Sequence, residues 1–268
     1  MRITDAQIHL WSGQGAPPHH IRAPFTIERA LREMDAAGIA RAVNCPAIWD
    51  ASANDYSIEA ATAHPDRFAT MGWFALDGST NAATVDEWLA KPGMHGLRFV
   101  LYAPEAGPML QSGALDWLWT RADEREVAVA LMVLPDHLPL LGDLARRYPR
   151  MRLIIDHLAI GPFALLPDAA SHLGSLLELS RHPNIAAKAT GLIGAAPDAY
   201  PFSSTHDILR RTFDAFGPER MFWGTDITRM QATWSDCVSA STEQLSWLTG
   251  VDLELVMGEG ISRWIGWP

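Results

Sequence analysis

Three polar side chains of different chemistry alternate near the start of the chain, in the stretch DAQIHLW: Asp5, Gln7 and His9. Alternate residues of an extended strand point the same way, so this spacing predicts that a carboxylate, an amide and an imidazole share one face. Such a face could belong to a metal site that has lost a ligand, or to a site that works without a metal.

Further polar or aromatic residues stand in or at the ends of later apolar runs. A carboxylate and two imidazoles that meet at one mouth can act as a general base and polarising groups. His9, His157 and Asp226 are therefore the first candidates. The other residues of this kind are Trp73, Arg98, Tyr102, Asp156 and Lys188.

Each candidate also has a purely structural interpretation. A single histidine at a strand end is often a hydrogen-bonded structural residue, and Asp226 could cap the following helix, because Asp is a favoured N-cap. Asp156 could anchor a backbone amide, while Lys188 and Arg98 could pair with acids inside the fold. Six other histidines are expected on the solvated surface, in loops or helix starts: His19, His20, His64, His95, His137 and His206.

The elements that must position these residues form a regular alternation. Helical patterns separate the apolar runs; one of them, residues 26–38, begins at a Thr suited to an N-cap and ends at a Gly suited to a C-cap. Eight strands alternating with helices predict an α/β fold, a (β/α)₈ TIM barrel, as a single domain over residues 1–268. A doubly wound open sheet is the alternative, but no Gly-rich phosphate loop follows the first strand. The predicted strands cover residues 2–10, 41–48, 68–76, 95–102, 127–134, 152–159, 184–192 and 220–227.

Composition narrows the partners. The formal net charge of −10 argues against nucleic acid, which needs clustered Lys and Arg, and the expected partner is a small molecule. No apolar run is long enough to span a bilayer and no signal segment is evident, so neither a membrane nor secretion is expected. The two cysteines form no CxxC pair, which favours a reduced, cytoplasmic protein. A homo-oligomer is compatible with the exposed helices of a barrel.

The sequence resembles the amidohydrolase superfamily, and within it the lactonase-rich branch that includes 2-pyrone-4,6-dicarboxylate lactonase and L-fuconolactonase. The resemblance rests on Asp-x-x-x-His in the first strand, on Asp156-His157, and above all on FGPERMFWGTDI (216–227). HPDRF (64–68), GLRF (96–99) and VMGEGISRWIGW (256–267) also fit the branch.

The resemblance implies roles for matching residues. The family's strand-one His-x-His corresponds to Gln7-x-His9, its strand-six His to His157, and its strand-eight Asp, a general base or metal-bound acid, to Asp226. The fifth strand offers only Ala130 to Leu134 where metal-dependent members carry a ligand, and none of these side chains suits zinc. The site is therefore expected to need no cofactor. A single divalent ion such as zinc, if bound, would lie on His9, His157 and Asp226.

We therefore expect a hydrolase that opens a lactone of sugar or aromatic-catabolic origin, with water activated by Asp226. His9, His157 and Gln7 would stabilise the oxyanion, and Arg98 would bind a substrate carboxylate. Metal-dependent amide or ester hydrolysis, non-oxidative decarboxylation, and a non-catalytic barrel that binds a small acid are the alternatives. The expected floor of the pocket consists of Trp11, Trp49, Trp73 and Tyr102.

Overall fold

Eight parallel strands form one sheet in sequence order, and the sheet is rolled into a nearly closed barrel. The computed structural model describes the whole chain, residues 1–268, and confirms the predicted (β/α)₈ barrel. The strands are β1 Thr4–Ile8, β2 Arg41–Asn44, β3 Phe68–Gly72, β4 Met94–Leu101, β5 Ala128–Val133, β6 Arg152–Ile155, β7 Ile185–Ala189 and β8 Met221–Trp223.

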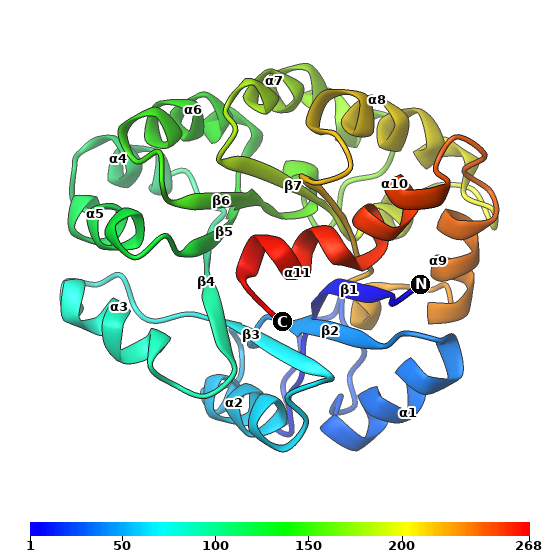
Figure 1. Cartoon of the computed structure of the whole chain (residues 1–268), viewed down its shortest axis with the longest axis horizontal. Coiled ribbons are helices and arrows are strands. Elements are labelled where there is room, and N and C mark those ends of the chain that lie inside the picture. Colours follow the sequence, from blue (N-terminus) through cyan, green and yellow to red (C-terminus); the bar gives the residue numbers. More distant parts are fainter.

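Helices surround the barrel (Figure 1). They are α1 Ile27–Ala37, α2 Ala53–Ala63, α3 Ala82–Leu89, α4 Ala106–Gln111, α5 Asp116–Glu124, α6 Leu138–Arg147, α7 Leu173–Glu178, α8 His206–Phe216, α9 Trp234–Thr242, α10 Gly250–Glu254 and α11 Gly260–Ile265. The caps expected for the first helix are present: the Thr26 hydroxyl accepts from the Arg29 amide, and Gly38 ends α1 with a φ of 71°. No helix is long and apolar enough to cross a membrane.

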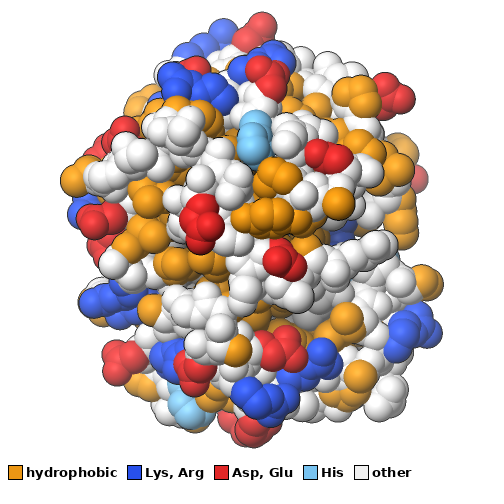
Figure 2. All heavy atoms as spheres, turned by 90° about the vertical axis from the view of Figure 1, so that its right-hand side faces the viewer, with side chains coloured by type: hydrophobic (Ala, Val, Ile, Leu, Met, Phe, Trp, Pro, Cys, Tyr) orange, Lys and Arg blue, Asp and Glu red, His pale blue; other side chains and the backbone are white.

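The barrel interior is filled largely by small side chains, such as Ala69 and Ala130. Helix α11 lies across the N-terminal end of the barrel (Figure 1), and Ile261 and Ile265 pack into the interior cluster with Trp267 just beyond the helix. The helix therefore closes this end of the barrel interior. On the side of the molecule seen in Figure 2, acidic and basic side chains are interspersed among apolar ones rather than gathered into a basic patch.

Each predicted strand ends earlier than expected, by one to four residues, and the shortened ends of the sixth and eighth strands are followed by site residues. The sixth ends at Ile155, after which His157, Leu158 and Ala159 all have positive φ angles of 52° to 58°. The eighth ends at Trp223, and Asp226 follows with a φ of 57°. Left-handed backbone cannot continue a strand, so these residues lie in turns that leave the barrel rim.

The prediction that Asp5, Gln7 and His9 share a face was wrong for Asp5. The register between β1 and β2 shifts between Asp5 and Ile8, and the backbone N–H of Gln7 donates to the Asp5 carboxylate at 3.0 Å. A bulge of this kind interrupts the alternation of side chains. The Asp5 side chain therefore points outward to α9, while Gln7 and His9 point toward the barrel axis.

Candidate active site

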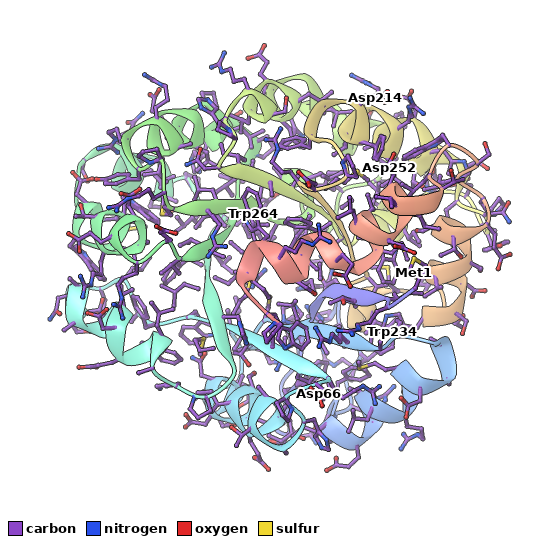
Figure 3. The ribbon with its side chains drawn as sticks, viewed as in Figure 1. Met1, Asp66, Asp214, Trp234, Asp252 and Trp264 are labelled. Atoms are coloured by element: carbon purple, nitrogen blue, oxygen red, sulfur yellow. The ribbon has the colours of Figure 1, made fainter.

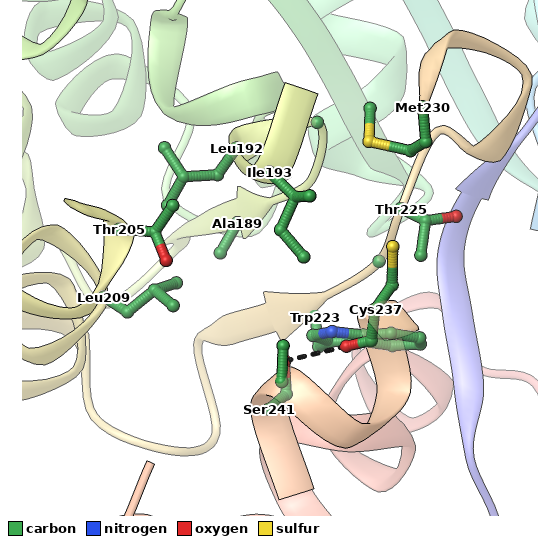
Figure 4. Close-up of a pocket in the computed structure, with 13 residues that line it drawn as sticks. Ala189, Leu192, Ile193, Thr205, Leu209, Trp223, Thr225, Met230, Cys237 and Ser241 are labelled. Carbon is green, nitrogen blue, oxygen red and sulfur yellow. Dashed lines mark hydrogen bonds between the residues drawn. The ribbon is translucent and has the colours of Figure 1, made fainter. Parts of the chain in front are cut away.

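A pocket of about 380 Å³ opens at the C-terminal end of the barrel. It collects several of the predicted site residues: His9, His157, Asp226, Arg98, Trp49 and Tyr102. A second cavity, between β7, β8 and α9, measures only about 20 Å³, too small for a substrate (Figure 4).

Asp226 is the only acidic side chain that lines the large pocket, and it is 1% exposed. Its Oδ1 atom has no hydrogen-bond donor and lies 3.3 Å from His9 Nε2. The Arg229 guanidinium donates to Oδ2 at 3.1 Å. Burial raises the pKa of this carboxyl, but the adjacent His9 ring and the Arg229 cation outweigh burial and hold the pKa well below its usual range. Asp226 is therefore a carboxylate at neutral pH.

His9 presents a lone pair to Asp226. Its Nδ1 atom lies 2.5 Å from the Cys45 carbonyl oxygen, which can only accept, so Nδ1 carries the proton of the neutral ring. Burial lowers the pKa of His9, which favours that neutral ring. The pocket-facing Nε2 is consequently an acceptor, and two acceptor atoms of different residues face each other across 3.3 Å.

His157 is also a neutral ring with its proton on Nδ1, and a chain of contacts fixes this protonation state. Lys188, completely buried, donates to Gln7 Oε1 at 3.1 Å, so the amide nitrogen of Gln7 faces His157 Nε2 at 3.4 Å. Nε2 accepts, and Nδ1 donates to Thr190, whose hydroxyl oxygen is 2.8 Å away. Burial lowers the pKa of His157 to about 4. Gln7 and Lys188 thus lie beneath the pocket and orient His157 instead of lining the pocket.

Arg98 reaches the pocket from β4. Its Nε atom donates to Asp156 at 2.7 Å, and its two terminal amino groups have no protein acceptor. Asp156 also lies 3.3 Å from Lys188 and does not line the pocket. Arg98 is therefore a buried cation with free donors toward the pocket, which is the arrangement that binds an anion.

The predicted aromatic floor is only half assembled. Trp49 and Tyr102 line the pocket. Trp11 is fully buried behind it, with its ring centroid 5.4 Å from that of Trp49. Trp73 lies outside the lining, where its carbonyl oxygen accepts from Asn54.

Several lining residues were missed. The solvated surface predicted for His20 was wrong: it is 7% exposed, bonded to the Thr228 hydroxyl at 2.8 Å and packed against the rings of His9 and Trp49. The same prediction was wrong for His137, which is also buried. His19 and Arg229 line the pocket as well. Of these, only Arg229 carried a readable signal, since it stands three residues after Asp226 in one turn.

Comparison with known proteins identifies the family. The amidohydrolase family model matches residues 4–255. The chain belongs to the amidohydrolase family. This confirms the predicted resemblance and makes the protein a hydrolase.

Relatives of this amidohydrolase cover almost its whole length. It is 28% identical to L-fucono-1,5-lactonase of Burkholderia ambifaria over 87% of this chain and 83% of the relative. An amidohydrolase of Burkholderia multivorans with bound zinc shares the fold, with a TM-score of 0.85 at 19% identity over 100% of both chains. A protein of Pseudomonas putida assigned as a 2-pyrone-4,6-dicarboxylic acid hydrolase has a TM-score of 0.79 at 20% identity over 99% of this chain and 98% of that one.

The donor set of this amidohydrolase does not match a zinc site. No three His, Cys, Asp or Glu side chains are arranged to hold a metal ion. The lone pair of His157 is taken by Gln7, and Asp226 Oδ2 by the Arg229 cation. The fifth strand contributes Met132 to the lining, a thioether unsuited to a hard divalent ion.

Proposed function

We propose that this amidohydrolase opens a lactone ring by direct attack of water that Asp226 deprotonates. The observation that carries the proposal is the pair of facing acceptors, Asp226 Oδ1 and His9 Nε2, 3.3 Å apart at the base of the pocket. One water molecule placed beside this pair can donate one hydrogen to each atom, which leaves a lone pair of its oxygen free to attack. The L-fucono-1,5-lactonase relative supports the reaction class.

The steps balance without a further reactant. The water oxygen bonds to the lactone carbonyl carbon while Asp226 takes a proton, and the negative charge moves to the carbonyl oxygen. The intermediate then expels the ring oxygen, which recovers the proton from Asp226. The Arg229 cation, held beside Asp226 at 3.1 Å, stabilises the developing negative charge.

The histidines receive a different role from the one predicted from the sequence. There, His9, His157 and Gln7 stabilised the oxyanion as donors. In its neutral state His9 presents a lone pair to the pocket, whereas the lone pair of His157 accepts from the side-chain amide of Gln7. We therefore assign the orientation of the water to His9.

The lining favours a flat lactone that carries a carboxylate. Arg98 offers free guanidinium donors for the carboxylate, and Trp49 offers aromatic surface in the lining for contact with the lactone. A sugar lactone needs acceptors for its hydroxyl groups, and the pocket has one carboxylate, Asp226, already committed to water and Arg229. We therefore rank a carboxylated pyrone-type lactone above a sugar lactone.

The test uses two lactones, 2-pyrone-4,6-dicarboxylate and L-fucono-1,5-lactone, with purified protein before and after chelation. We expect faster hydrolysis of the carboxylated lactone and less than about twofold loss after chelation. Asp226→Asn should lose about 10²- to 10⁴-fold in kcat, the usual contribution of a general base. The control, Asp198→Asn, changes a carboxylate that is bonded to Ser204 and does not line this pocket, and should keep the rate.

Other results would assign a different function. Full activity of Asp226→Asn contradicts its role as the base. Loss of activity on chelation, restored by zinc, contradicts the metal-free mechanism and supports a metal-dependent amide or ester hydrolase or a decarboxylase. Binding of the lactone without turnover supports a non-catalytic barrel.

A further inference from the structure

Asp5 is a buried carboxylate that the proposed reaction does not use. It is fully buried and accepts four hydrogen bonds: from the backbone N–H of Gln7 at 3.0 Å, the backbone N–H of Thr225 at 2.9 Å, the Thr225 hydroxyl at 2.5 Å and the Trp234 indole at 2.7 Å. Trp234, from α9, lies beside the start of the chain in Figure 3, and the Thr225 hydroxyl points toward β1 in Figure 4. Every oxygen of the carboxylate is therefore engaged.

Two of the four bonds come from Thr225, the residue that precedes Asp226. At the next residue, the backbone N–H of Asp226 donates to the backbone carbonyl oxygen of Gln7 at 2.9 Å. Gly224 completes the turn: a Cβ atom there would lie 2.7 Å from the Asp5 carboxylate. The turn is thus bonded to β1 at Thr225 and Asp226, and the glycine at position 224 lets the two segments approach closely.

The pinned turn places Asp226 in a backbone conformation that is uncommon in proteins. Asp226 has a φ of 57°, in the left-handed region that is disfavoured for residues with a Cβ atom. This conformation aims its carboxylate at His9 Nε2, 3.3 Å away. No strand ladder joins β1 to β8, since they are the two ends of the strand order. At this level of the barrel, Asp5 therefore supplies the link that a ladder supplies elsewhere.

We propose that Asp5 is a positioning residue for hydrolysis, which acts through Thr225 to hold the carboxylate of Asp226 at its contact with His9 Nε2. The proposal rests on the proposed role of Asp226 as the base. A catalytic group displaced by about 1 Å can lose about 10²-fold in rate.

The test compares three variants with one control. Asp5→Asn turns an amide donor toward the Trp234 indole or toward Thr225, so the turn must shift. Thr225→Val keeps the shape and removes only the hydroxyl bond, and Thr225→Ser restores it. In the control, Asp123→Asn, the altered carboxylate also accepts two backbone amides, from Arg150 and Met151, but at the opposite end of the barrel.

The measurements are kcat and KM on 2-pyrone-4,6-dicarboxylate or L-fucono-1,5-lactone, whichever the unmodified protein opens faster, together with the thermal midpoint. We expect kcat to fall about 10- to 100-fold in Asp5→Asn and about 10-fold in Thr225→Val, with KM within about threefold. Thr225→Ser should retain kcat. Asp123→Asn should lower the midpoint and leave kcat unchanged.

Two outcomes overturn the proposal. In the first, Thr225→Val loses thermal stability like Asp123→Asn but keeps kcat. In the second, the loss falls on KM alone. A crystal structure of Thr225→Val tests the geometry without turnover: Asp226 should leave its contact with His9, and an unmoved Asp226 contradicts the inference. Absence of hydrolysis by the unmodified protein counts against the proposed function, and the crystallographic comparison then decides on Asp5 alone.

Discussion

Asp156 is the carboxylate whose removal should affect stability most. It is fully buried and shared by two buried cations, with Arg98 Nε at 2.7 Å and Lys188 Nζ at 3.3 Å. Burial raises the pKa of this carboxyl, but Lys188 and Arg98 outweigh burial and hold it well below its usual range. Asp156→Asn keeps the shape of the side chain and leaves both cations without a counter-ion.

The size of the effect follows from the two contacts. A pair of unit charges at about 4 Å attracts by about 4 kcal/mol in a medium of effective dielectric constant ~20. Relief from burying the carboxylate offsets part of this, and breaking a buried pair typically destabilises a protein by about 3–5 kcal/mol. For 268 residues with an unfolding entropy of about 2.1 cal/mol/K per residue, that corresponds to a midpoint lower by roughly 5–9 °C.

Calorimetry and urea unfolding at pH 7 measure the change. The matched control is Asp86→Asn, because Asp86 also bridges two cations, Arg121 and Arg125, but on the surface, where the midpoint should hardly change. Asp156→Asn/Lys188→Met removes one orphaned cation and should regain part of the loss. The difference in free energy of unfolding between the unmodified protein and Asp156→Asn should narrow as pH falls below about 3.8, where an unfolded Asp takes up its proton. Equal midpoints for Asp156→Asn and Asp86→Asn would refute this reasoning.

Three further outcomes are expected. Trp49→Leu should raise KM for either lactone several-fold, whereas Trp73→Leu should leave it unchanged, because only Trp49 lines the pocket; equal effects in steady-state kinetics would contradict this geometry. Arg98→Lys should raise KM for 2-pyrone-4,6-dicarboxylate more than for L-fucono-1,5-lactone, since a lysine loses the bidentate fork. The free energy of unfolding should fall between pH 6.5 and 5 by about 2 kcal/mol from His157, whose pKa is lowered from 6.5 to about 4 by folding, because the unfolded chain binds the extra proton. Folding raises the pKa of Asp5 to about 6, so the folded state takes up this proton first as pH falls, which adds about 1 kcal/mol to the free energy of unfolding over the same range. Urea titrations of the unmodified protein and of His157→Gln separate the two contributions.

The strand-end rule accounts for the part of the site that could be predicted. Alternating apolar runs indicated a barrel, and a barrel places the residues that end its strands at one mouth. That argument brought His9, His157 and Asp226 together, although they follow three different strands, the first, sixth and eighth. It depends only on element order, which hydrophobic periodicity encodes well.

The missed features depend on local backbone geometry that periodicity does not encode. The bulge after Asp5 reversed the direction of one side chain, and the left-handed turn at His157 shortened a strand. His20 reaches the pocket along a loop whose path is set by tertiary contacts, here with Thr228 and Trp49. Trp73 is of a residue type that often lines ligand pockets, but it lies outside the lining of this one.

The seam between β1 and β8 also has a consequence for how the molecule folds. The bonds that join Asp5 to Thr225 close a loop of 220 residues, so the ordering of most of the chain must precede them. A nascent chain therefore acquires its catalytic geometry only after its last strand has been synthesised. Both termini lie at the plugged end of the barrel (Figure 1). Joining them and opening the chain elsewhere would make β8 and β1 neighbours in sequence, and the last contact to form would become one of the first.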